Sequence, residues 1–236
     1  MTPDAVLLDA GGIFHLPDHD IVLDALERVG VAVDPELLDR AHYAGAACFP
    51  PDYEGELPWR EMWERYLAAY VAELEVPDDL RAEATEHLES EFATAAIWRR
   101  VIPGSPDGLR TLADTGVRLG VVSNADGDVG ARLRDQEVLQ LGPGPGVEME
   151  TIIDSGQVGV MKPDPRIFEM ALLALELPPE RVWYVGDMPG IDVAGARRAG
   201  IEPFLMDPYG FNSHLDCERV VSLQDLASRV SGRVPG

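Results

Sequence analysis

A chain of 236 residues, 46% of them apolar, is long enough for one large domain or for a core domain with a smaller one attached. Its formal net charge of −23 repels phosphate backbones and anionic lipid, so we expect neither nucleic-acid nor membrane binding. Two cysteines make no disulfide framework, and no apolar run approaches the roughly 20 residues that cross a bilayer. With no basic residue ahead of the first apolar run, we expect no signal peptide and a cytoplasmic protein; nothing in the sequence defines an oligomeric state.

Six short apolar runs predict the strands of a buried parallel sheet. The first covers residues 5–9 and closes at Asp9, ahead of two glycines. The others cover residues 117–122, 151–154, 181–185 and 203–206, with a weaker run at 219–221. Helices are predicted between them at 105–115, with Ser105 as the N-cap, at 165–175 and at 191–199. This alternation indicates an α/β fold with a doubly wound parallel, Rossmann-like sheet.

Residues 16–100 interrupt the alternation with helical periodicity and no strand candidate. Four helices are predicted there, at 21–29, 35–47, 59–74 and 78–98. We therefore expect an inserted α-helical cap domain at 16–100 and a core domain made of residues 1–15 and 101–236. Hinges near 16–17 and 100–103 would let the cap open and close. The segment 141–146 is predicted to be a flexible surface loop.

Polar residues follow the predicted strands at the carboxyl edge, where open parallel sheets bind their ligands. These residues are Asp9, Ser123 with Asn124, and Asp187 with Asp192. A loop at 161–164 follows the third strand and contains Lys162, the only lysine of the chain. Each position alone is typical of a helix cap or a loop, but four such positions at one sheet edge indicate a site.

The set suits phosphoryl transfer. A carboxylate such as Asp9 can attack phosphorus to give an aspartyl-phosphate. Because the protein is acidic, an anionic substrate needs local positive charge, which a Mg²⁺ ion held by Asp9 and Asp187 would supply. Lys162 would neutralise the nucleophile and the phosphoryl oxygens, and Ser123 with the amides after it would hydrogen-bond those oxygens. Asp192 would orient Lys162 or a metal-bound water.

Over nearly its whole length the chain resembles the haloacid dehalogenase-like hydrolases, a family with a helical first-type cap at this place. The resemblance rests on Asp9-Ala-Gly-Gly-Ile13, Val122-Ser-Asn124, residues 159–168 around Lys162, and Gly186-Asp-Met-Pro-Gly-Ile-Asp192. It implies a hydrolase with Asp9, Lys162, Ser123 and Asp192 as catalytic residues. It also implies phosphate binding by Ser123, Asn124, Lys162 and Gly12, and Mg²⁺ binding by Asp9, Asp187 and the carbonyl of Gly11.

The first motif departs from the family pattern at two positions. Most phosphatases of the family have an aspartate two residues after the nucleophile, which serves as the general acid and base; here that position is Gly11, and Ile13 replaces the family's Thr or Ser. Losing a positioned acid or base costs a factor of roughly 10² to 10⁴ in rate. Candidate substitutes are His15, Asp18, His19 and Asp20, which follow the motif, and His42 in the cap.

Three functions fit this pattern. The first is a Mg²⁺-dependent phosphatase that acts on a small phosphorylated metabolite. The second is a 2-haloacid dehalogenase, whose relatives also lack the second aspartate, although Asp187 would repel Asp9 in a metal-free site. The third is a catalytically weak member that binds a ligand or a partner. A phosphonoacetaldehyde hydrolase is set aside because the cap contains no lysine.

The predicted cap is rich in aromatic residues, which predict either core packing or an aromatic substrate pocket. They are Tyr43, Phe49, Tyr53, Trp59, Trp63 and Tyr66.

Overall fold

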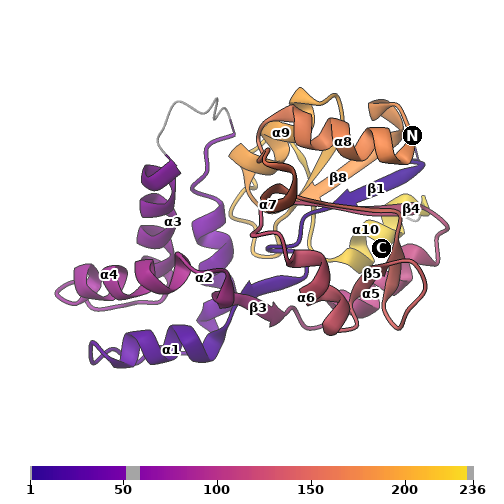
Figure 1. Ribbon diagram of the computed structural model, residues 1–236. Coiled ribbons are helices and arrows are strands. Elements are labelled where there is room, and N and C mark those ends of the chain that lie inside the picture. Colours follow the sequence, from indigo (N-terminus) through magenta and orange to yellow (C-terminus); the bar gives the residue numbers. More distant parts are fainter. Residues whose placement is uncertain (1, 52–58, 233–236) are drawn as a thin grey trace.

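The computed structural model describes residues 2–51 and 59–232 (Figure 1). Six parallel strands form the central sheet in the order β10-β9-β8-β1-β4-β7. Their bounds are β1 Ala5–Leu8, β4 Arg118–Ser123, β7 Thr151–Asp154, β8 Val182–Gly186, β9 Glu202–Met206 and β10 Glu218–Val220. The predicted α/β fold with a parallel sheet is therefore confirmed, with each strand within about a residue of its predicted position.

Helices cover both faces of this sheet (Figure 1). Because side chains alternate along a strand, Val6 and Leu8 of β1 pack on one face and Leu7 on the other. The first face is covered by α5 Ser105–Ala113, α6 Val129–Asp135 and α10 Leu223–Val230, and the second by α8 Pro165–Leu175 and α9 Ala194–Arg198. The short α7 Ser155–Val158 follows β7. The doubly wound arrangement leaves the carboxyl ends of β1, β4 and β8 as neighbours.

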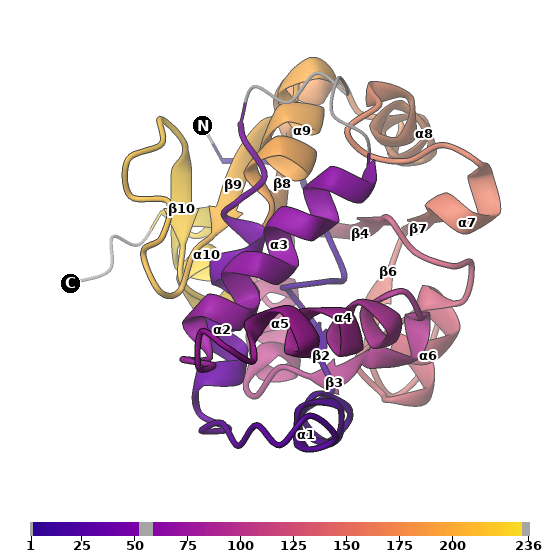
Figure 2. The same cartoon turned by 90° about the vertical axis from the view of Figure 1, so that its left-hand side faces the viewer.

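The segment between the first two sheet strands contains four helices: α1 His19–Glu27, α2 Leu37–Ala46, α3 Trp59–Glu73 and α4 Arg81–Phe92. Figure 2 views the molecule from the side of this helical segment, which lies in front of the sheet. The segment has an apolar core of its own, in which Tyr66, Tyr70 and Phe49 are fully buried. The core-packing prediction is confirmed for Phe49 and Tyr66, whereas Tyr53 lies outside the described residues.

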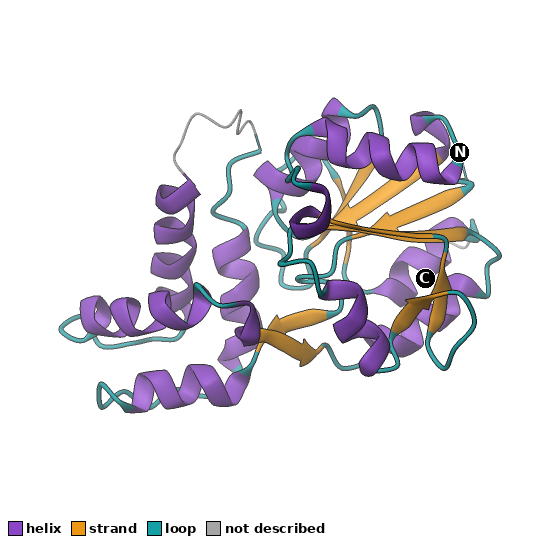
Figure 3. Cartoon of the chain, viewed as in Figure 1, coloured by secondary structure: helices purple, strands orange, loops and turns teal. Residues whose placement is uncertain are grey.

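Two short strands border the helical segment, where the sequence predicted none. β2 His15–Pro17 pairs antiparallel with β3 Trp98–Val101, and the pair lies between the helices and the large sheet (Figure 3). Three or four residues are too short to show a period-two pattern, which is why these strands were missed. The predicted helix at 78–98 extends too far towards the C-terminus. Its last residues form the 3₁₀ turn 95–97 and the first residue of β3.

Two further helix predictions were wrong in detail. Ser105 is the first residue of α5 instead of its cap; Gly104 precedes it with φ +81°, and the Ser105 hydroxyl makes no hydrogen bond. The predicted helix at 191–199 is a π-turn at Pro189–Val193 followed by α9.

The loop predicted at 141–146 begins at the end of β5 Leu139–Leu141 and leads to β6 Val147–Met149. Within the described residues, no helix is both long and apolar enough to span a membrane.

Candidate active site

The sheet register brings the predicted strand-end residues together. Leu8 of β1 lies opposite Val121 of β4 on one side and Val185 of β8 on the other. Because neighbouring parallel strands end at the same edge, Asp9 lies between Ser123 and the loop that holds Asp187. All three side chains are buried, as are Lys162 and Asp192. The structure therefore gathers the residues that the sequence assigns to one site.

Lys162 is the centre of a buried polar network. Its Nζ lies 2.7 Å from Asp9 Oδ2, 2.7 Å from Asp192 Oδ1 and 2.8 Å from the Tyr184 hydroxyl. Burial opposes the charge on the amine, but the attraction of Asp192 and Asp9 outweighs it and raises the pKa of Lys162. An ammonium group has three donors. All three have acceptors here, so Lys162 is charged and fully engaged.

Tyr184 was not identified from the sequence, because it lies inside the apolar run that predicts β8. Its hydroxyl is 2.9 Å from Asp192 Oδ1 and 3.2 Å from the Val122 carbonyl. A tyrosine that is fully buried in a parallel strand needs a partner for its hydroxyl. That requirement is the one signal that could have marked it.

Asn124 differs from the expectation that it binds phosphate. Its Nδ2 donates to the Lys162 carbonyl at 3.0 Å, and its Oδ1 accepts from the Lys162 backbone N–H at 2.7 Å. Both ends of the amide therefore contact the backbone of the lysine loop. In this arrangement Asn124 positions Lys162.

Asp187 receives a contact from the helical segment that the sequence did not predict. His42 of α2 is fully buried, with Nε2 2.9 Å from Asp187 Oδ2 and Nδ1 2.9 Å from the Tyr66 hydroxyl. Burial raises the pKa of Asp187, and the hydrogen bond to His42 counters part of that rise. Asp192 Oδ2 accepts from the backbone N–H groups of Asp187 and Met188 at 3.0 and 2.9 Å. His42 thus holds the carboxylate of Asp187, and two backbone N–H groups hold that of Asp192.

Asp9, Asp187 and Asp192 form a compact acidic cluster. One oxygen from each lies within 4.8 Å of the others. Burial raises the pKa of Asp9 to about 7, although the charge of Lys162 lowers it. Three buried carboxylates face one ammonium, and oxygen ligands of this kind suit a hard divalent cation. The residues present therefore fit a magnesium ion.

Glycine is required where the backbone passes this cluster. A Cβ on Gly12 would lie 2.3 Å from Asp187 Cγ, and one on Gly186 would lie 2.2 Å from Asp192 Cγ. Gly12 also has φ +65°, which favours glycine. Its carbonyl accepts from the Tyr43 hydroxyl at 2.7 Å. Close packing and a positive φ thus account for a glycine at position 12.

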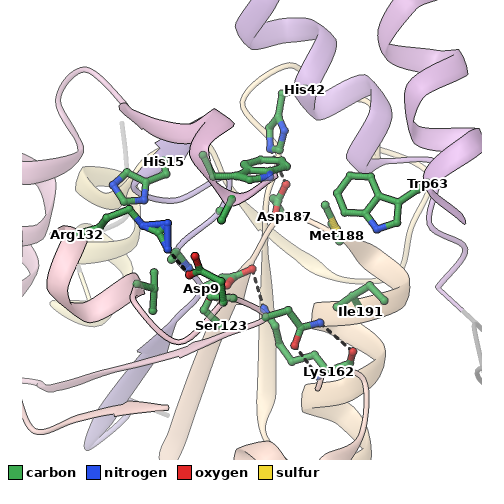
Figure 4. Close-up of a pocket in the computed structure, with 18 residues that line it drawn as sticks. Asp9, His15, His42, Trp63, Ser123, Arg132, Lys162, Asp187, Met188 and Ile191 are labelled. Atoms are coloured by element: carbon green, nitrogen blue, oxygen red, sulfur yellow. Dashed lines mark hydrogen bonds and ion pairs between the residues drawn. The ribbon is translucent and has the colours of Figure 1, made fainter. Parts of the chain in front are cut away.

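A cavity of about 150 Å³ opens onto Asp9 (Figure 4). Figure 4 shows His15 and Arg132 on one side of Asp9, and Trp63, Met188 and Ile191 on the other. Gly11, Ser123, Asn124, Lys162 and Asp187 also line it. Gly12, expected at the phosphate, is not among its lining residues. The site thus has one polar and one largely apolar side.

Two of the five candidates for the missing acid or base, His15 and His42, line the cavity. Asp18 caps α1 and pairs with Arg99, His19 bonds Asp39 at 2.8 Å, and Asp20 is exposed. The last three have ordinary structural or surface roles.

A parallel sheet with an acidic cluster and a lysine buried at its carboxyl edge defines an α/β protein with a polar site beyond the strand ends. Residues 51–200 match the family model of the haloacid dehalogenase-like hydrolases. The chain belongs to this family and is a hydrolase, so the resemblance seen in the sequence is confirmed.

Two curated relatives and one solved structure illustrate the likeness. The chain is 30% identical to the human haloacid dehalogenase-like hydrolase domain-containing protein 3 over 183 residues, which is 75% of this chain and 70% of that protein. It is 37% identical to the phosphoserine phosphatase of Thermus thermophilus over 112 residues, which is 46% of this chain and 43% of that enzyme. A HAD-superfamily hydrolase from Ehrlichia chaffeensis has the same fold, with a TM-score of 0.58 at 19% identity over 98% of this chain and 97% of that one. The match to the Thermus enzyme thus spans less than half of that protein.

Proposed function

We propose that the chain is a Mg²⁺-dependent phosphatase that acts on a small phosphorylated metabolite, with Asp9 as the nucleophile. The observation that carries the proposal is the buried acidic cluster, in which Asp9 and Asp187 lie together with one ammonium to balance them. A phosphoserine phosphatase among the relatives supports the same reaction class. The cavity of about 150 Å³ is small beside the roughly 300–1,000 Å³ of drug-sized pockets, which supports a small substrate.

The side chains divide the chemistry among them. Asp9 attacks phosphorus, the ester P–O bond breaks, and the leaving oxygen takes a proton from water to depart as an alcohol; a second water then hydrolyses the aspartyl-phosphate, releasing phosphate and regenerating Asp9. Lys162 neutralises the charge that gathers on the nucleophile and the phosphoryl oxygens. Ser123 hydrogen-bonds those oxygens, and Asp192 holds Lys162 in position. Asp9, Asp187 and the carbonyl of Gly11 would hold the magnesium ion, which supplies further positive charge for the phosphoryl group.

We also propose that residues 16–100 act as a cap on a core of residues 1–15 and 101–236. The chain passes between the two through the paired strands β2 and β3, and the helical segment contributes Trp63 and His42 to the cavity. A cap that closes over Asp9 would exclude bulk water from the site while Asp9 attacks the substrate.

The 2-haloacid dehalogenase is the second candidate, and the absence of an aspartate at position 11 favours it. A metal-free dehalogenase site would leave Asp187 as an extra buried carboxylate beside Asp9. A panel of phosphomonoesters with Mg²⁺ beside a panel of 2-haloacids separates the two. Phosphate release that EDTA abolishes supports the phosphatase, whereas halide release insensitive to EDTA contradicts it.

Mg²⁺ is expected to raise the melting temperature more at pH 8 than at pH 5.5. The folded pKa of Asp9 is about 7 against an ordinary 3.8, so ionising this group opposes folding. Without metal, this contribution makes the protein most stable at low pH, and the stability falls as pH rises from about 4 to 7. A bound cation stabilises the ionised form, so its benefit is largest above pH 7. Differential scanning fluorimetry with and without Mg²⁺ measures this; equal shifts at both pH values would contradict a magnesium site at Asp9.

We infer that His15 replaces the missing acid or base of position 11. Its Nε2 lies 2.5 Å from Gln136 Oε1, and Gln136 Nε2 donates to the Arg99 carbonyl, which fixes the amide orientation. An amide oxygen accepts only, so Nε2 carries the proton and Nδ1 is left with a lone pair. Burial, aided by Arg132, lowers the pKa of His15, so the ring is neutral at neutral pH. A neutral ring suits the base that activates water against the aspartyl-phosphate. In His42, both ring nitrogens are engaged.

His15→Gln is expected to lower kcat by a factor of roughly 10² to 10⁴ and to let the aspartyl-phosphate accumulate. With saturating Mg²⁺, which stabilises ionised Asp9, wild-type activity is expected to fall as pH drops through the lowered pKa of His15, and the variant is expected to lack that acidic limb. Steady-state rates from pH 5 to 8 and an acid quench measure both effects. His19→Gln, a substitution of the same kind outside the cavity, is the control. A variant that keeps wild-type kcat rules out His15 as the base.

A further inference from the structure

Arg132 is a cation at the cavity that the reaction described above does not use. It lies on α6, which follows the strand that ends at Ser123. Val129 and Arg132 both line the cavity, as expected for positions i and i+3 on one helix face. In Figure 4 its guanidinium extends toward the Asp9 side of the cavity, next to His15. No motif of the family marked this residue.

The guanidinium of Arg132 keeps donors that the protein does not satisfy. One terminal nitrogen pairs with Asp126, and Nε is buried without a hydrogen-bond partner. A buried donor without an acceptor is costly, but Nε has almost no accessible surface, so a ligand in the cavity would meet the terminal nitrogens of the guanidinium. The pair with Asp126 is partly exposed, at 26% for Arg132 and 40% for Asp126. Such a pair positions the guanidinium and stabilises the fold little.

The other cation of the cavity cannot serve a second anion. Lys162 gives its three donors to Asp9, Asp192 and Tyr184. The opposite side of the cavity is largely apolar, with Trp63 and Ile191. Among the described residues that line the cavity, Arg132 is therefore the charged group with donors left for a ligand. A guanidinium fork matches a carboxylate better than a point charge does.

We propose that Arg132 binds a carboxylate of the substrate, so that the substrates are small phosphate monoesters that carry a carboxylate. The proposal rests on the proposed phosphatase activity and names its substrate class. The carboxylate lies on the His15 side of Asp9, and the apolar side accepts the carbon skeleton. A carboxylate is favoured because its two oxygens match the two terminal nitrogens of a guanidinium.

Two matched pairs of probes test this. 2-Phosphoglycolate differs from ethyl phosphate, and 3-phosphoglycerate from glycerol 3-phosphate, in having a carboxylate at the end of the same carbon chain. We expect wild type with Mg²⁺ to have a kcat/KM roughly ten- to hundredfold higher for the carboxylate member of at least one pair, the range of a charge-assisted hydrogen bond. Arg132→Gln is expected to remove that preference, and Arg132→Lys to keep part of it.

Arg134→Gln is the matched control, because Arg134 lies on the same helix, is exposed and pairs with Asp135. It is expected to keep the full preference. Thermal melts check that each variant is folded. If Arg132→Gln is unfolded, the Arg132→Lys variant tests the proposal in its place. An unchanged preference for the carboxylate probes in Arg132→Lys then overturns the proposal. A wild type without a preference in either pair, or an Arg132→Gln variant that retains it, also overturns the proposal.

A binding measurement separates this proposal from the phosphatase activity. Isothermal titration calorimetry measures the affinity of the same probes, with Mg²⁺, for Asp9→Asn and for the double variant that also carries Arg132→Gln. Because Asp9→Asn does not turn over the probes, the difference in affinity is the contribution of Arg132 to binding. If the carboxylate probes bind more tightly and this needs Arg132, while the wild type hydrolyses no phosphomonoester, the carboxylate site is supported and the phosphatase is contradicted. Equal binding within both pairs would contradict the carboxylate site alone.

Discussion

Asp9→Asn is expected to lower kcat for phosphomonoesters by a factor on the order of 10⁴ or more without unfolding the protein. Asparagine has the shape of aspartate but its amide does not attack phosphorus. Lys162 keeps its contacts with Asp192 and Tyr184 in the variant. Because burial raises the pKa of Asp9 to about 7, removing its charge does not destabilise the folded state at pH 8. Steady-state kinetics and thermal melts at pH 8 measure both quantities.

Asp135→Asn is the control for this substitution, because Asp135 is an exposed acid at the end of α6. Its activity is expected to equal that of wild type. If the Asp9→Asn variant keeps a kcat within tenfold of wild type, Asp9 is not the nucleophile. A variant that loses its melting transition would show a structural role instead.

Lys162→Met is expected to abolish activity and to cost about 3–5 kcal/mol of unfolding free energy at pH 8. The substitution leaves Asp9 and Asp192 buried without their cation. Removing that cation favours the protonated form of Asp9, so the folded pKa of Asp9 rises further above its ordinary value. The destabilisation is therefore smaller at pH 5.5 than at pH 8.

Urea unfolding at the two pH values measures this difference. Arg166→Met is the control, because Arg166 is an exposed cation paired with Asp164, and surface pairs contribute about 1 kcal/mol or less. A Lys162→Met variant as stable as the Arg166→Met variant at pH 8 would contradict the buried charge network.

The strand-end residues could be predicted because the rule behind them is geometric. A short apolar run that stops at an acid predicts a carboxylate at the carboxyl edge of a sheet, and Asp9 and Asp187 follow directly. Lys162 lies in a loop, and its sole occurrence in the chain marked it. The large sheet was predictable because most of its strands contain a short apolar run, as in Ala5–Leu8 of β1 and residues 119–122 of β4.

The missed features depend on contacts between distant segments. His42 contacts Asp187 across 145 positions of sequence, and Asn124 contacts Lys162 across 38, so neither pair has a local pattern. β2 and β3 are stable only as a pair and are too short to be recognised singly. The family resemblance assigned Gly12 to phosphate binding, whereas its packing against Asp187 is a tertiary constraint that the sequence does not show.

The most direct test of Asp9 as nucleophile is the mass of the peptide that contains it after rapid acid quench. Wild type with Mg²⁺ and a phosphomonoester is expected to yield that peptide with one added phosphoryl group on Asp9, and His15→Gln to yield more of it. A chain that turns over substrate while Asp9 stays unmodified in both, or that carries the phosphoryl group on another residue, would contradict the account.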